Sequence, residues 1–132
     1  MCAEKTIFRG LSHEGKRLIL ERHNELRRKV AKGQETGGIN APQPAAANMR
    51  KLVWNTELEE IAQRWADQCT FGHDKVRTKL DGTSVGQNAY IGYSSAQSEE
   101  SVIQSAMAVA AQNWYDEVTK PGFDSQNIDP YK

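Results

Sequence analysis

Apolar residues return at helical spacing near the start of this 132-residue chain. The members of this first stripe are Ile19, His23, Leu26 and Val30. Their spacing predicts a helix with one buried face, with Ser12 as its N-cap and Gly33 as the residue that ends it. The remaining face is densely charged, and we interpret it as a solvated surface on which Glu25 and Lys29 form an i,i+4 ion pair.

The second stripe has the clearest helical pattern in the chain. Thr56 and Glu59 fit a capping box, in which each side chain bonds the backbone N–H of the other residue. The apolar positions are Leu58, Ile61, Ala62, Trp65, Ala66 and Cys69. This spacing predicts a helix that faces a core, with Cys69 on the buried side or at its edge.

A third helix is predicted from Glu99 to Thr119, with Ser98 as its cap. The small side chains of Ala106 and Ala110 would let another element approach this helix closely. The sequence Lys120-Pro121-Gly122 ends it, because proline lacks a backbone N–H and glycine adopts non-helical angles.

The segments between these helices contain a loop and one strand. Residues 34–47 are predicted to be a loop, because they hold two adjacent glycines and two prolines. Residues 85–93 are predicted to contain a strand, because their central part has β-branched and aromatic residues. A lone strand leaves its backbone groups without partners, so we expect further strands beyond Lys132.

The overall composition excludes some classes of protein. No stretch approaches the length of a membrane-spanning helix, and the mean hydropathy is −0.71. The net charge is zero, which argues against a dedicated nucleic-acid binder. Residues 1–80 carry 15 Lys and Arg against 10 Asp and Glu, whereas residues 81–132 carry 2 against 7. Either the two halves attract each other within one fold, or the first half presents a weakly basic face to an acidic partner.

Few residues offer catalytic chemistry. Cys69 and His73 lie four apart, but a buried structural thiol or half-cystine is favoured over a nucleophilic pair. His73 follows a helix end and is expected near the surface. Glu117 lies on or beside the apolar face of the third predicted helix, so its carboxylate must be paired, hydrogen-bonded or at the mouth of a cleft. His23 and Arg27 are interpreted as structural residues.

Several motifs occur in an order that resembles the CAP superfamily (cysteine-rich secretory, antigen 5 and pathogenesis-related 1 proteins), closest to its arthropod venom allergen 5 branch. They are His23-Asn24-Glu25-Leu26-Arg27, Asn48-Met49-Arg50-Lys51-Leu52-Val53-Trp54-Asn55, Ala62-Gln63-Arg64-Trp65-Ala66-Asp67-Gln68-Cys69, Phe71-Gly72-His73-Asp74, Val85-Gly86-Gln87-Asn88 and Trp114-Tyr115-Asp116-Glu117-Val118. The resemblance covers residues 11–132 and is specific because the motifs keep their order.

The resemblance implies an α+β fold, an α-β-α sandwich with a central antiparallel sheet. It also implies a cleft with two His and two Glu that can bind a divalent metal such as zinc. By motif position, His73 matches one His and Glu117 one Glu, whereas Gln87 stands at the other Glu position. The second His belongs to a Gly-His-Tyr-Thr-Gln type motif, which is expected beyond Lys132. Trp65 and Trp114 lie in the motifs as structural residues.

The resemblance further implies a secreted, disulfide-bonded protein, with Cys2 and Cys69 as the disulfide candidates. We expect residues 1–10 to be an N-terminal extension without a signal peptide. Residues 11–132 would then be the N-terminal two-thirds of a CAP domain.

Three functions remain open from the sequence. The first is a venom or saliva protein that binds without turnover, whose candidate targets are an ion channel, a sterol or a fatty acid, with host antibodies as partners of an allergen. The second is a metal-dependent hydrolase or protease, for which Gln87 could not serve as the base. The third is a partial or non-functional fragment.

Overall fold

The computed structural model describes residues 10–93 and 99–127. Its helices are α1 (His13–Ala31), α2 (Thr56–Ala66) and α3 (Glu99–Asp116), followed by a π-helical turn, η1 (Val118–Gly122). The order agrees with the three helices expected from the sequence. The proposed cap Ser98 and the disulfide candidate Cys2 lie outside the described residues. No helix in the described part is long and apolar enough to cross a membrane.

The ends of α1 are those that the sequence predicts. The Ser12 Oγ accepts the backbone N–H of Gly15 at 3.1 Å. At the other end, Gly33 has a φ of 67° and donates its N–H to the carbonyl of Val30 at 2.8 Å. Both local signals are therefore confirmed.

The charged face of α1 pairs differently from the prediction. Glu25 accepts from Arg22 at 3.1 Å, and Lys29 reaches Glu35 in the following loop at 2.7 Å. The predicted ion pair between Glu25 and Lys29 is therefore wrong. A buried carboxylate on the loop is a stronger partner for the ammonium than an exposed carboxylate one turn away.

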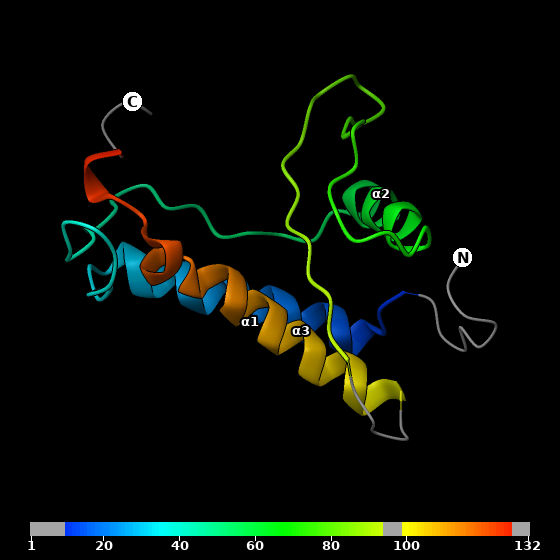
Figure 1. Ribbon diagram of the computed structural model, residues 1–132, viewed down its shortest axis with the longest axis horizontal. Coiled ribbons are helices and arrows are strands. Elements are labelled where there is room, and N and C mark those ends of the chain that lie inside the picture. Colours follow the sequence, from blue (N-terminus) through cyan, green and yellow to red (C-terminus); the bar gives the residue numbers. More distant parts are fainter. Residues whose placement is uncertain (1–9, 94–98, 128–132) are drawn as a thin grey trace.

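The best-packed part of the molecule lies between α1 and α3, which run side by side in roughly the same direction (Figure 1). Ala110 and Ala111 are only 1% and 2% exposed, and Leu26 on α1 is also buried. The prediction that Ala110 allows close approach is confirmed. Arg22 additionally donates to the side chain of Gln112 across this contact.

The start of α2 lies one residue away from the predicted cap. Asn55 is the N-cap, because its Oδ1 accepts the backbone N–H of Leu58 at 3.0 Å. Thr56 is the first helical residue, so the capping box built on Thr56 is wrong. Asparagine is the stronger N-cap of the two residues, which explains the shift.

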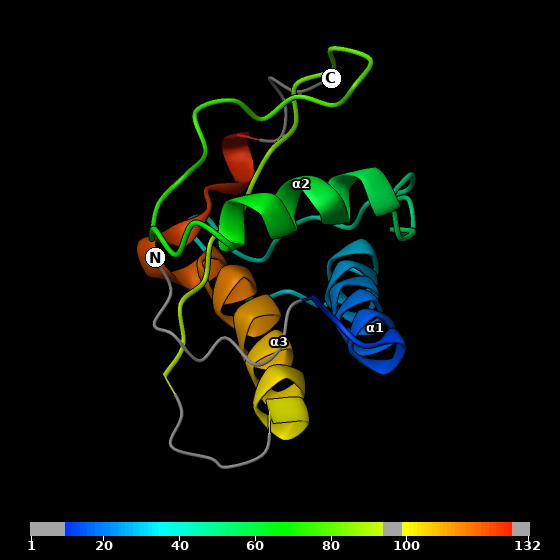
Figure 2. The same cartoon turned by 90° about the vertical axis from the view of Figure 1, so that its right-hand side faces the viewer.

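Helix α2 stands apart from the other two helices (Figure 2). None of its residues is buried, and it does not pack against another helix of the described part. The prediction that its stripe faces a core is therefore wrong for the chain as described. The stripe faces an open cavity, because no described layer fills the space beside it. Cys69 lies beyond the end of α2 and is exposed, so it is not buried, but it borders the same cavity as the stripe, at its edge.

Residues 85–93 form an extended run without helix, turn or bend, next to α3 (Figure 1). The described residues contain no sheet. They hold only two isolated β-bridges, Ile39 with Asp124 and Thr78 with Ser84. The predicted strand therefore has no paired neighbour here, and the α-β-α sandwich is not confirmed.

The third helix ends earlier than predicted. Its regular part stops at Asp116, and the chain continues into η1, where Lys120 has non-helical angles. Pro121 and Gly122 follow, so the predicted helix stop lies in the turn rather than at the helix end.

Candidate functional site

An apolar cavity of about 690 Å³ lies between α2, α3 and the extended run 85–93. Most of its lining comes from aliphatic and aromatic side chains. Its apolar members include Leu11, Ile19, Trp54, Ala62, Trp65, Ala66, Phe71, Ala89, Tyr90, Ile91, Ile103, Met107, Ala110 and Trp114. The stripes of α2 and α3 thus meet across open space instead of interdigitating.

Hydrogen bonds hold the three indole rings of the cavity. Trp65 donates its Nε1–H to the carbonyl of Gly72 at 2.9 Å, and Trp114 donates to the carbonyl of Ala89 at 3.1 Å. Trp54 donates to Glu59 at 2.7 Å. Because each polar N–H already has a partner, the rings present their apolar surfaces to the cavity.

Glu59 is the acidic residue of the cavity lining, and it is paired. Its carboxylate lies 2.5 Å from Lys16 Nζ on α1. The hydrogen bond from Lys16, followed by the one from Trp54, lowers the pKa of Glu59 below its usual value. The ion pair links α1 to α2 and keeps this carboxylate ionised at neutral pH.

His73 and Gln87, two of the predicted cleft residues, lie together. Gln87 Oε1 accepts the backbone N–H of Asp74 at 3.0 Å and lies 3.1 Å from His73 Nδ1. A backbone N–H only donates, so the amide atom facing it is the oxygen, and the ring nitrogen beside that oxygen must carry a hydrogen. Gln87 therefore holds His73 as the Nδ1–H tautomer and leaves the Nε2 lone pair as the acceptor of the exposed ring.

Glu117 lies at a different place. It is exposed and lines a second cavity, of about 500 Å³, with Val30, Pro44 and Phe123 among its neighbours. The structure does not bring Glu117 into contact with His73 or Gln87. In residues 10–93 and 99–127, no group of three or more His, Cys, Asp and Glu could hold a metal ion. The described residues thus do not fit the divalent metal that the resemblance implies.

His23 and Arg27 project from α1 toward neighbouring segments. His23 Nδ1 lies 2.8 Å from the carbonyl of Ile19, and its ring centroid is 6.0 Å from that of Trp114. Arg27 donates from Nε and Nη2 to the carbonyl of Arg50 at 3.1 and 2.8 Å. Both side chains therefore join α1 to other parts of the fold.

Cys69 ends the α2 region with a φ of 52° and lines the apolar cavity. No described cysteine is a free thiol. The pairing with Cys2 stays a prediction, because Cys2 lies outside the described residues.

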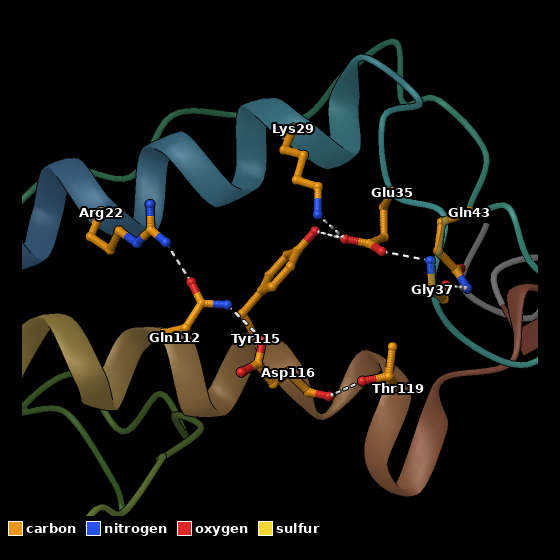
Figure 3. A network of polar contacts seen from close by, with 9 residues as sticks. All are labelled: Arg22, Lys29, Glu35, Gly37, Gln43, Gln112, Tyr115, Asp116 and Thr119. Carbon is orange, nitrogen blue, oxygen red and sulfur yellow. Dashed lines mark hydrogen bonds and ion pairs between the residues drawn. The ribbon is translucent and has the colours of Figure 1, made fainter.

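A polar cluster that the sequence did not reveal lies at the far end of α1 and α3 (Figure 3). Its centre is Glu35, which is only 4% exposed. The carboxylate accepts from Lys29 Nζ at 2.7 Å, from the Tyr115 hydroxyl, and from the backbone N–H of Gly37 at 2.6 Å. These bonds, that of Lys29 foremost, lower the pKa of Glu35 to about 2. Burial, followed by the bond to Glu35, raises the pKa of Tyr115.

This cluster fixes the loop 34–47 against both helices. A Cβ atom at Gly37 would lie 2.5 Å from the Thr119 side chain, and one at Gly38 would lie 2.7 Å from the carbonyl of Phe123. The paired glycines are therefore needed for the close approach of the loop to η1. From the sequence, the two glycines predict only a loop. The role of Glu35 is not visible there, because nothing in the neighbouring sequence distinguishes it from an exposed acid.

Residues 20–129 match the CAP family, described as the cysteine-rich secretory protein family. The chain belongs to the CAP family. It is 44% identical over 131 residues to venom allergen 5 of Microctonus hyperodae, a match that spans 99% of this chain and 53% of the relative. It is 44% identical over 118 residues to venom allergen 5.02 of Dolichovespula maculata, spanning 89% of this chain and 52% of that protein. It is 55% identical over 96 residues to venom allergen 5 of Polistes dominula, a match that spans 70% of this chain and 42% of that protein.

These relatives confirm the resemblance to venom allergen 5 within the CAP family. The CAP chain described here spans about half the length of the curated relatives that it matches.

Proposed function

We propose that this chain is a secreted, venom-allergen-like CAP protein that binds its target without chemical turnover. Its ligand is an elongated apolar molecule of the fatty acid or sterol class, bound in the cavity between α2 and α3. The observation that carries this proposal is the volume and lining of that cavity, about 690 Å³ walled by aliphatic and aromatic side chains. Ligand sites in proteins commonly measure about 300–1,000 Å³ and have few polar groups.

The chemistry of the lining favours an apolar chain over a charged ligand. The three indoles already use their N–H groups within the protein. Glu59 is neutralised by Lys16. The amide of Asn88 and the Oε1 of Gln63, whose Nε2 donates to Asp67 at 2.9 Å, are polar groups of the lining suited to a hydroxyl or carboxyl end of the ligand.

Energy transfer from tryptophan tests this proposal directly. A polyene fatty acid and a fluorescent sterol would each be titrated into the chain after lipid removal, with excitation of the three tryptophans that line the cavity. We expect saturable energy transfer for at least one of the two probes. Ala66→Phe, which fills the cavity lining, should weaken that binding at least tenfold.

The matched control is Ala108→Phe on α3, an exposed position outside the lining. It should leave the affinity for the probe within twofold of the unmodified chain. Absence of saturable transfer with both probes, or equal weakening by the two substitutions, would contradict binding in this cavity.

Two further parts of the proposal rest on the relatives. These relatives are venom allergens by name, which supports secretion and recognition by host antibodies for this chain. Modulation of an ion channel is the remaining candidate activity. Immunoblotting of venom or saliva and of the secreting tissue, with antibodies raised against this chain, tests secretion. Detection in the tissue alone would contradict it.

We also infer that residues 11–132 form the N-terminal two-thirds of a CAP domain. The support is the half-length coverage of the relatives and the extended run 85–93 without a paired strand. Strands supplied after Lys132 would pair with this run. The transcript downstream of the Lys132 codon should encode a Gly-His-Tyr-Thr-Gln type motif, and a stop codon at that point would contradict the inference.

A further inference from the structure

The positive charge of the first half of the chain is concentrated in one stretch. Residues 26–56 contain six Lys and Arg but only one acidic residue, Glu35. The resulting excess of five positive charges equals the whole excess of residues 1–80, which carry 15 Lys and Arg against 10 Asp and Glu. Because Glu35 is already paired with Lys29, five cations of the stretch are left without an acidic residue in it.

The fold brings the two ends of this stretch together. After the loop 34–47, the chain runs back along α1 toward the start of α2 (Figure 1). The Asn24 side chain accepts the N–H of Leu52 at 2.8 Å and donates to the Leu52 carbonyl at 3.1 Å. One turn further along α1, Arg27 donates to the carbonyl of Arg50. The segment around Arg50 is therefore fixed beside the C-terminal half of α1.

Four exposed cations lie on these two segments, and we call them the basic strip: Arg28, Lys32, Arg50 and Lys51. None of them forms an ion pair in the part of the chain that the structure describes. Arg28 and Lys32 are about 6 Å apart along the helix axis, and Arg50 and Lys51 are consecutive. These spacings are shorter than the Debye length of about 8 Å at physiological salt, so the charges act together.

The basic strip lies away from the apolar cavity. Arg28 follows Ile19 by nine residues, about two and a half helical turns, so the two side chains are on opposite faces of α1. On the extended segment 49–55, successive side chains point to opposite faces, so Lys51 and Val53 point away from Trp54. Ile19 and Trp54 line the cavity. A layer that fills the cavity side would therefore leave the basic strip uncovered.

A structural role accounts for only half of the basic strip. Cations in the last turn of a helix stabilise its dipole, and Arg28 and Lys32 are placed to do so. Arg50 and Lys51 lie on an extended segment, which has no comparable dipole. A concentration of like charge that the fold does not neutralise attracts a partner of opposite charge.

Val53 indicates which kind of anionic partner fits. Its side chain is 80% exposed, on the same face of the segment as Lys51. An apolar side chain beside cations suits the boundary between lipid headgroups and acyl chains. A soluble polyanion such as a sulfated polysaccharide offers no apolar phase to Val53.

We propose that the basic strip docks this chain on a membrane surface rich in anionic lipids, with Val53 inserted at the headgroup boundary. Docking uses a face remote from the cavity lining, so it does not rest on the proposed ligand site. Either property can fail while the other holds.

Co-sedimentation with lipid vesicles tests the proposal. One set of vesicles consists of phosphatidylcholine, and the other of equal parts phosphatidylcholine and phosphatidylserine. We expect the chain to bind the second set only. Raising the salt from about 0.1 M to about 1 M shortens the Debye length from about 10 Å to about 3 Å, and should release the chain.

A matched pair of double variants locates the surface. Each Lys or Arg near an anionic lipid surface raises the partition coefficient about fivefold, so Arg28→Gln with Lys51→Gln should lower it roughly twentyfold. Arg64→Gln with Lys75→Gln makes the same change in net charge at exposed cations outside the basic strip. This control should change the coefficient by less than twofold.

A second matched pair tests the insertion of the apolar side chain. Val53→Ser should lower the partition coefficient about fivefold, because it removes apolar area from the headgroup boundary. Val76→Ser, at a valine that is 73% exposed elsewhere, should change it by less than twofold. Equal weakening by the two double variants, or by the two serine variants, would overturn the proposal. Binding to heparin without binding to the anionic vesicles would assign the basic strip to a polysaccharide and overturn it as well.

Discussion

Glu35 joins a long loop to two helices through one buried carboxylate. Its bonds to Lys29, Tyr115 and the backbone of Gly37 are present only in the folded chain. They lower its pKa from 4.5 to about 2. A carboxyl whose pKa is lowered by folding stabilises the folded state above its unfolded pKa, and this contribution is lost as the pH falls through the folded value.

The free energy of unfolding should therefore fall between pH 5 and pH 2 by an amount that depends on Glu35. Glu35→Gln cannot ionise, so it should flatten this part of the pH profile and lower stability at pH 7 by about 1–3 kcal/mol. Urea denaturation of both proteins across this range measures the effect. Parallel pH profiles of the two proteins would show that Glu35 does not carry the dependence.

Gln87 controls which nitrogen of His73 holds the proton. With the amide oxygen bonded to the backbone of Asp74, His73 is the Nδ1–H tautomer when neutral. Gln87→Leu removes the acceptor and should shift the ring toward the Nε2–H tautomer, whereas Gln87→Glu keeps an acceptor oxygen and should preserve Nδ1–H. The ¹⁵N shifts of the imidazole, assigned with His73→Ala, distinguish the tautomers. A predominant Nε2–H form in the unmodified chain would rule out this role.

At the scale of the elements, the sequence predicts local features well. The caps of α1 depend on neighbours within four residues, and Ser12 and Gly33 behave as expected. The sequence does not predict Glu35 as the partner of Lys29, because the Glu35 carboxylate contacts the Lys29 ammonium only when the loop folds back onto α1. The sequence predicts that the α2 stripe is buried, but no residue of α2 is buried, because burial of the stripe depends on a layer that the described residues do not supply.

The start of α2 offers a matched pair of substitutions. Asn55 is the N-cap in the structure, whereas the sequence pattern favours Thr56. Asn55→Ala should cost about 1 kcal/mol of helix stability, which lowers the amide protection of α2 about fivefold. Thr56→Ala should change that protection by less than twofold. Hydrogen exchange of residues 56–66 measures both, and a larger effect of Thr56→Ala would place the cap at Thr56.

At the scale of the whole molecule, the family is readable from the sequence, whereas the site is only partly so. The ordered motifs predict CAP membership, and the match over residues 20–129 confirms it. Of the three cleft positions, His73 and Gln87 are in contact, but Glu117 lines another cavity. Their convergence depends on how distant segments pack, which spacing along the chain does not determine.

The molecule consists of two unequal parts. The pair α1 and α3, with the docked loop 34–47, is packed, whereas α2 and the run 85–93 border an open apolar cavity. This openness provides the proposed ligand site.

Hydrogen exchange of the lipid-free chain measures the difference between these two parts. We expect protection to concentrate in residues 13–31 and 103–116, with little in residues 56–66 and 86–93. Equal protection of α2 and the run 85–93 with the α1–α3 pair would contradict it, because the cavity between them would then be closed.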